Sequence, residues 1–150
     1  MADPILFILN GPNLNLLGER EPQVYGRTTL PEIEAACRAR AAARGLALDF
    51  RQTNHEGVLV EAVHEARTAA AGLIVNPAGF SFTSIALLDA LKMYDGPKIE
   101  LHITNIHARE EIYHRSLVSR AVTAVIAGLG ASGYGVAIDA IGMLLDERRA

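Results

Sequence analysis

The sequence predicts one doubly wound α/β domain: a five-stranded parallel sheet between two helical layers, forming a three-layer α/β/α sandwich. Short apolar runs alternate with segments of helical spacing along all 150 residues. Strands that alternate with helices favour a parallel sheet covered on both faces. Several of the apolar runs are continuous, as in strands that are buried on both sides.

The first third of the chain predicts a strand, a helix and a second strand. Residues 5–9 (ILFIL) are a continuous apolar run that ends at a turn sequence. Thr29 can cap a helix that begins near Pro31, because proline suits the first helical turn. Gly45 is the expected left-handed residue at the end of that helix. Residues 46–52 alternate in polarity and predict the second strand.

The middle of the chain repeats this order. Residues 56–70 place apolar side chains at helical spacing and end at Gly72. Residues 73–75 (LIV) predict a third, buried strand. A helix is expected over residues 85–93, and the turn sequence at 95–97 (DGP) ends it.

The last third predicts two more strands, at residues 99–103 and 122–127, and a closing helix over 130–145. Together the elements indicate a flavodoxin-like domain. In such sheets a ligand binds beyond the carboxyl ends of the strands, where the strand order reverses. Candidate site residues are therefore expected directly after strands.

Composition and charge narrow the function classes. The net charge is −3 and the sequence pI is about 5.9, so nothing favours binding to nucleic acid or to an anionic membrane. The single cysteine, Cys37, excludes an intrachain disulfide and is expected to be a small buried residue in a helix. No export signal or apolar segment of membrane-spanning length is visible, so we expect a cytoplasmic protein.

Three polar segments follow predicted strands, at residues 11–26, 76–84 and 100–111. The first carries Arg20 and Tyr25 between two glycines, which is typical of a mobile lid with hinges at its ends. A simpler interpretation is that its asparagines, Asn13 and Asn15, only bond the local backbone of a turn.

The histidines and a glycine motif leave alternatives open. His102 lies within an apolar strand and is either a core residue or a catalytic one. No spacing among the five histidines resembles a metal site, so no metal is expected. Residues 128–133 (GLGASG) have the spacing of a dinucleotide fingerprint, but the chain ends before the second strand and acidic residue that this motif needs. These glycines are expected to form a tight turn.

The segments NGPNLNLLGEREPQVYG, QTNHEG, NPAGFSFTS, ELHITNIHAREE and GLGASGYGVA resemble, in order and spacing, those of type II 3-dehydroquinate dehydratases. The resemblance covers essentially the whole chain, residues 1–150, as one domain. It implies a flavodoxin-like fold, no cofactor, and assembly into a dodecamer that is a tetramer of trimers. It also implies a small cyclic carboxylate substrate, 3-dehydroquinate, which loses water to give 3-dehydroshikimate.

The resemblance also implies catalytic roles. Tyr25 matches the lid tyrosine that acts as the base; a free tyrosine has a pKa of about 10, so its ionisation needs a nearby cation. Arg20 matches the lid arginine that can supply it. Asn13 matches the residue that holds a water on the enolate. His102 matches the general acid, and Glu100 matches the carboxylate that orients it.

Substrate-binding residues follow from the same match. Asn76 and the backbone near Ile103 and Thr104 match the site for the substrate carboxylate. Arg109 falls in the matched segment near the lid. Asp89 matches a residue that reaches a neighbouring subunit's site.

Three positions depart from the family pattern. Phe82 stands where the family has a histidine that contacts ring hydroxyls, and Tyr113 replaces an arginine with a similar task. Leu88 replaces a further arginine. The leading hypothesis is a dehydratase acting on 3-dehydroquinate. The alternatives are the same mechanism on a less hydroxylated cyclic β-hydroxy ketone acid, or a catalytically silent member that serves in binding or assembly.

Overall fold

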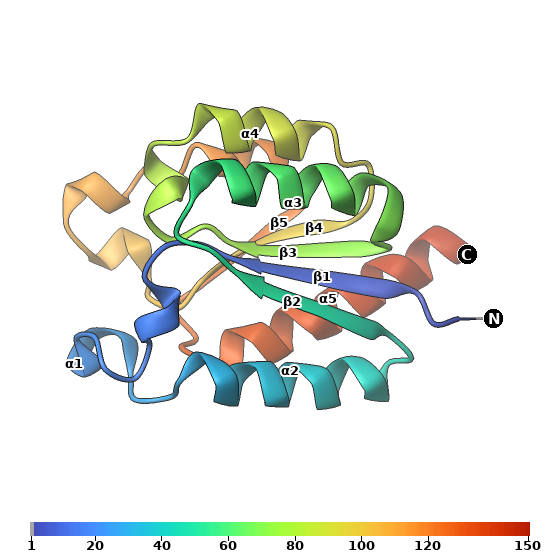
Figure 1. Cartoon of the computed structure of the whole chain (residues 1–150), viewed down its shortest axis with the longest axis horizontal. Coiled ribbons are helices and arrows are strands. Elements are labelled where there is room, and N and C mark those ends of the chain that lie inside the picture. The colour runs from blue at the N-terminus through green and yellow to red at the C-terminus, as the bar shows by residue number, and fades with distance from the viewer. Residues whose placement is uncertain (1) are drawn as a thin grey trace.

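The computed structural model describes residues 2–150, and its five strands form one fully parallel sheet in the order β2-β1-β3-β4-β5 (Figure 1). The strands are β1 Ile5–Asn10, β2 Ala47–Gln52, β3 Gly72–Asn76, β4 Lys98–His102 and β5 Ala124–Ala127. All five lie where the sequence predicts them, and the flavodoxin-like order is confirmed. The order reverses between β1 and β3.

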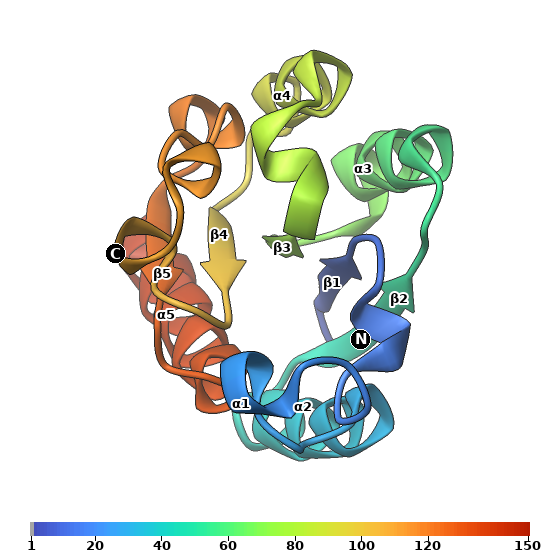
Figure 2. The ribbon, with the colours of Figure 1, turned by 90° about the vertical axis from the view of Figure 1, so that its left-hand side faces the viewer.

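Two helical layers cover the sheet (Figures 1 and 2). The helices α2 (Leu30–Ala43) and α5 (Ser132–Arg149) lie on one face, and α3 (Glu56–Ala69) and α4 (Ile85–Lys92) lie on the other. The short helix α1 (Pro22–Tyr25) stands apart, beyond the carboxyl ends of the strands. Short 3-10 turns complete the chain: η1 Leu14–Leu16, η2 Ala78–Phe82, η3 Ile106–Ala108, η4 Glu111–Tyr113 and η5 Val118–Ala121.

The central strands divide the core into two apolar layers. Along β1, Leu6 and Ile8 pack toward α2 and α5, whereas Phe7 and Leu9 pack toward α3 and α4. Successive strand residues point to opposite faces, so a strand covered on both sides needs apolar residues throughout. This is the physical reason for the continuous apolar run.

The expected helix signals are confirmed. Thr29 Oγ1 accepts a hydrogen bond from the Glu32 backbone N–H at the start of α2. Gly45 follows α2 with a φ of +72°, in the left-handed region. Cys37 is buried in the core, and burial raises the pKa of its thiol to about 12. The closing helix differs most from expectation: α5 begins and ends later than predicted, at Ser132 and Arg149.

The glycines after β5 form the expected tight turn. Gly128 and Gly130 have φ values of +95° and +64°. Their backbone N–H groups donate to the carbonyl oxygens of His102 and Ile103, at 3.3 and 3.0 Å. The turn therefore holds the end of β4, where polar residues of the third segment begin.

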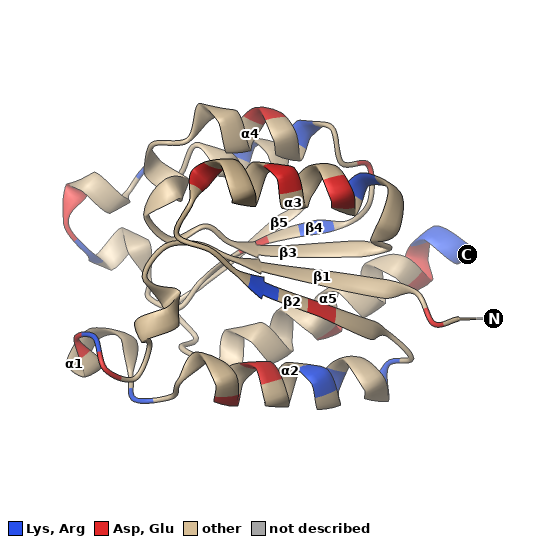
Figure 3. Cartoon of the chain, in the orientation of Figure 1, with Lys and Arg blue, Asp and Glu red and all other residues tan. Residues whose placement is uncertain are grey.

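Charges are spread over the outside of the molecule. Acidic and basic residues are interspersed along the helices, and the central strands carry few of them (Figure 3). Within residues 2–150, no helix has the length and apolar character needed to cross a membrane.

Candidate active site

A pocket of about 250 Å³ lies beyond the carboxyl ends of the strands, the end of the molecule that faces the viewer in Figure 2. Its walls come from the segments after β1, β3 and β4, so it lies at the reversal of the strand order. Ten of the twelve site residues proposed from the sequence line it. Glu100 lies behind the wall, and Asp89 lies on the exposed side of α4.

The loop after β1 brings Asn13 to the pocket in a left-handed conformation, with a φ of +70°. Its backbone N–H donates to Asn54 Oδ1 at 2.9 Å. Gln52 Nε2 donates both to the Gly11 carbonyl and to Asn54 Oδ1. The end of β2 thus holds this loop, a supporting role that the sequence did not reveal.

The loops after β1 and β3 are in close contact. A Cβ atom on Gly11 would lie 2.3 Å from the Pro77 carbonyl oxygen, so only glycine fits there. This contact brings Asn13 and Asn76 to the same pocket.

The segment expected to be a lid spans residues 18–26, and both of its end glycines have positive φ: +91° at Gly18 and +85° at Gly26. The Tyr25 hydroxyl accepts a hydrogen bond from Arg109 Nη1 at 3.0 Å. The guanidinium carbon of Arg20 lies 4.8 Å from the centre of the Tyr25 ring, over its face. Two cations therefore contact Tyr25, and the one bonded to its oxygen is Arg109, whereas the sequence singled out Arg20.

A buried pair, Glu100 and His102, lies at the inner wall of the pocket. Glu100 is 0% exposed, and its Oε2 contacts His102 Nε2. Burial by itself raises the pKa of Glu100, but the hydrogen bonds with His102 and Ser119, together with the nearby Ser116 hydroxyl, outweigh it and hold the pKa below its ordinary value. His102 is therefore held by an ionised carboxylate. Its ring also stacks on Phe82, with ring centres 6.2 Å apart.

Asn76 is fixed by a buried network. Its Nδ2 donates to the Tyr134 hydroxyl at 3.0 Å, and that hydroxyl donates to Asn10 Oδ1 at 2.6 Å. Its Oδ1 accepts from the Ala78 backbone N–H at 3.3 Å. Burial raises the pKa of Tyr134, so this hydroxyl stays neutral and can donate. The amide of Asn76 consequently has one orientation at the pocket.

The remaining wall is aromatic. Phe82 and Tyr113 meet edge to face, with ring centres 5.4 Å apart. The guanidinium carbon of Arg109 lies 4.1 Å from the Tyr113 ring centre. Leu88, by contrast, is buried in the apolar layer beneath α4 and does not line the pocket.

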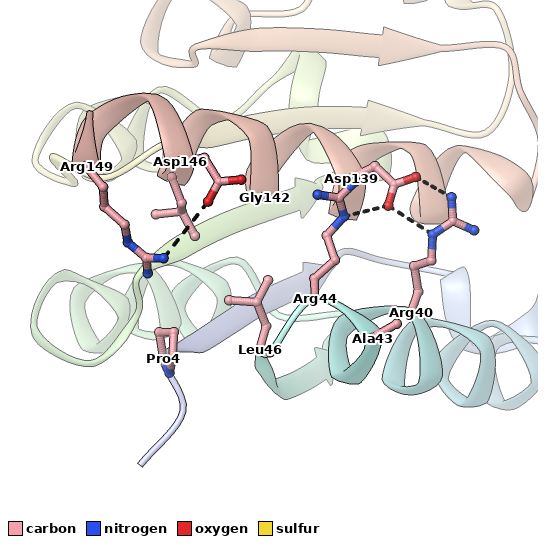
Figure 4. Close-up of a pocket in the computed structure, with 11 residues that line it drawn as sticks. Pro4, Arg40, Ala43, Arg44, Leu46, Asp139, Gly142, Asp146 and Arg149 are labelled. Carbon is pink, nitrogen blue, oxygen red and sulfur yellow. Dashed lines mark hydrogen bonds and ion pairs between the residues drawn. The ribbon is translucent and has the colours of Figure 1, made fainter. Parts of the chain in front are cut away.

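A second hollow, of about 560 Å³, lies between α2 and α5 (Figure 4). Arg40 and Arg44 both bond the Asp139 carboxylate across it. The two arginines lower the pKa of Asp139 to about 2, with the Arg40 hydrogen bond the largest cause. None of the site residues proposed from the sequence lies here. In residues 2–150, no three His, Cys, Asp or Glu side chains gather in a metal-binding group.

The chain matches a known protein family. The model of the class II dehydroquinase family matches residues 4–142. The chain is 52% identical to a 3-dehydroquinate dehydratase of Streptomyces avermitilis, covering 100% of this chain and 95% of the relative. It is 54% identical to the 3-dehydroquinate dehydratase of Caulobacter vibrioides, over 93% of this chain and 95% of that one.

A solved structure also matches this chain. The type II dehydroquinase from Propionibacterium acnes superposes with a TM-score of 0.90 at 43% identity, covering 95% of this chain and 98% of that one.

Proposed function

Since the chain belongs to the class II dehydroquinase family, we propose that it is a 3-dehydroquinate dehydratase, a hydro-lyase. It removes water from 3-dehydroquinate to give 3-dehydroshikimate, in the shikimate pathway or in quinate catabolism. The observation that carries this proposal is the pocket itself: a lid tyrosine bonded to arginine faces a buried Glu–His pair across about 250 Å³.

Tyr25 is the proposed base. Elimination begins when a base takes the proton from the carbon beside the ketone, and an ionised tyrosine oxygen can do this. Arg109 donates a hydrogen bond to that oxygen and Arg20 lies over the ring, so two cations contact the residue proposed to take the proton. The electron pair of the broken C–H bond moves into the enolate, and a water held by Asn13 bonds the enolate oxygen.

His102 is the proposed acid. When the enolate collapses, the carbon–oxygen bond at the β position breaks, and His102 gives its proton to the departing hydroxyl, which leaves as water. Glu100 holds the ring from its far edge during this step. After one turnover Tyr25 carries the extra proton and His102 lacks one, so a proton must return from the first to the second before the next.

The substrate carboxylate is proposed to bind at Asn76 and the backbone near Ile103 and Thr104. All three line the pocket, and the Tyr134 hydrogen bond keeps the Asn76 amide in one orientation. Fixed donors lose little freedom on binding, so they orient a substrate well.

The aromatic wall favours a second candidate: the same reaction on a cyclic β-hydroxy ketone acid with fewer hydroxyls. Phe82 offers no hydrogen bond, and Tyr113 offers only its hydroxyl. A substrate hydroxyl that faces Phe82 loses its bonds to water without replacement. Relative activity on the two substrates separates the candidates.

We further propose a homo-oligomer, a dodecamer built as a tetramer of trimers. Asp89 is exposed on α4 and lies outside the pocket lining of its own chain, so it is free to complete a neighbour's site. Native mass spectrometry at micromolar concentration should show multiples of three chains. If the protein is a monomer, Asp89 cannot contribute to a neighbouring subunit's site. The buried, lone Cys37 is consistent with a reducing compartment, and we propose the cytoplasm.

The reaction has a direct assay. The product has a carbon–carbon double bond conjugated to the ketone, which absorbs ultraviolet light, whereas the substrate has none. Purified protein mixed with 3-dehydroquinate should produce this absorbance at a rate proportional to enzyme concentration. No absorbance above the uncatalysed rate would contradict the proposal.

A further inference from the structure

The buried Glu100 carboxylate has two oxygens, and only one contacts His102. The other, Oε1, accepts a hydrogen bond from the Ser119 hydroxyl. Ser119 belongs to η5 and does not line the pocket. A residue outside the pocket thus contacts the carboxylate that holds the proposed acid.

The position of Ser119 is fixed from two sides. Its neighbour Val118 is 0% exposed and packs in the apolar layer beneath α4. The Leu117 backbone N–H donates to the Ser81 carbonyl at 2.8 Å, one residue before Phe82 in the pocket wall. The Ser119 hydroxyl is consequently held in place by the same framework that builds the site.

We propose that Ser119 is a positioning residue, which fixes the Glu100 carboxylate so that its other oxygen holds the His102 ring. This inference rests on the proposed function, in which His102 is the acid. The terminal torsion of a glutamate side chain has broad wells, so a carboxylate without a donor on Oε1 can turn. A buried carboxylate that loses a donor also favours its neutral form, which no longer attracts a charged imidazole.

The surroundings of Glu100 make this contact specific. The basic side chain that contacts Glu100 is His102, through Oε2. The Ser116 hydroxyl also helps to lower the Glu100 pKa, yet it is buried and makes no hydrogen bond of ordinary geometry. Ser116 therefore offers a comparison: a hydroxyl near the same carboxylate that does not fix it.

The first test is the pH dependence of turnover on 3-dehydroquinate. Ser119→Ala should lower kcat about 10-fold and leave KM little changed, because one hydrogen bond to a charged group is lost. The acid limb of kcat should move up by about 1 pH unit, since the pKa of Glu100 rises when its anion loses a donor. Ser119→Thr, which keeps the hydroxyl, should restore most of the rate, and Ser116→Ala, which removes no hydrogen bond to the carboxylate, should lower kcat less.

The second test needs no activity. In infrared difference spectra recorded against pH, a protonated Glu100 gives a carbonyl stretch that Glu100→Gln removes. This band should appear at higher pH in Ser119→Ala than in the natural protein. If Ser119→Ala folds poorly, Ser119→Cys keeps the size with a weak donor and should give the same shift.

The outcomes separate the two proposals. An unchanged infrared titration in Ser119→Ala and Ser119→Cys, or an equal loss of kcat in Ser116→Ala, would overturn the role of Ser119. A natural protein without dehydratase activity would instead remove the proposed function, while the infrared shift would still show that Ser119 fixes Glu100.

Discussion

Two pockets of this molecule pair charged side chains, and they do so in different surroundings. At the carboxyl ends of the strands, Glu100 and His102 are 0% and 5% exposed. Between α2 and α5, the Asp139 and Arg40 side chains are 27% and 52% exposed. The second pocket is also the larger, about 560 Å³ against about 250 Å³.

Exposure decides how strongly the members of each pair interact. Water screens the Arg40–Asp139 pair, and exposed pairs contribute little even with good geometry. A buried pair interacts strongly and can hold a proton in one place. Volume does not distinguish the proposed site, since it is the smaller of the two pockets, whereas burial and the type of hydrogen-bond partner favour it.

The largest expected effect is at the lid. Tyr25→Phe should lower kcat by about 10²–10⁴-fold, the usual contribution of a general base. Thermal unfolding should be unchanged, because the removed hydroxyl bonds only Arg109 at the pocket. Steady-state turnover on 3-dehydroquinate measures kcat, and a melting curve measures thermal unfolding. Near-normal turnover would remove Tyr25 from the mechanism.

A smaller effect is expected at the aromatic wall. Combining Phe82→His with Tyr113→Arg adds two donors and should raise kcat/KM on 3-dehydroquinate by about 10²-fold, at 1.5–3 kcal/mol per bond to a charged group. The kcat/KM on an analogue that lacks the ring diol should fall in the same double variant. If the natural protein already turns over 3-dehydroquinate as fast as ordinary dehydroquinases and the double variant is slower, Phe82 is a neutral replacement.

The smallest effect is expected between α2 and α5. Asp139→Asn removes the partner of Arg40 and Arg44 and should lower the unfolding temperature by at most about 3 °C, with turnover unchanged. A large loss of turnover in Asp139→Asn would contradict the assignment of catalysis to the other pocket alone.

The pH dependence of that effect has a definite sign. Because the folded-state pKa of Asp139 is lowered to about 2, its contribution to stability is present above its ordinary pKa of about 3.9. That contribution is lost as the pH falls through about 2. The difference in stability between Asp139→Asn and the natural protein should therefore close over this acidic range.

The strands and most of the pocket could be predicted from the sequence because their signals are local. Continuous apolar runs locate β1 and β3, and the polar residues that follow them, such as Asn13 and Asn76, must lie at the same edge of a parallel sheet. The roles of Glu100 and His102 came from the family resemblance, and their contact follows from a spacing of two along a strand.

The supporting contacts could not be predicted in this way. Arg109 and Tyr25 are 84 positions apart, Tyr134 and Asn10 are 124 apart, and Ser119 and Glu100 are 19 apart. Such contacts depend on how loops and α5 pack against the sheet, which no local pattern encodes. The resemblance implies Arg20 as the cation beside Tyr25, and no local pattern shows that Arg109 bonds the Tyr25 hydroxyl.

The most direct test is a crystal structure of Tyr25→Phe frozen soon after 3-dehydroquinate is added, since this variant should consume the substrate about 10²–10⁴-fold more slowly. The substrate should lie in the pocket beyond the strands, with its carboxylate at Asn76 and Thr104 and its β-hydroxyl toward His102. Substrate bound instead between α2 and α5, or turned so that its carboxylate faces His102, would contradict this prediction.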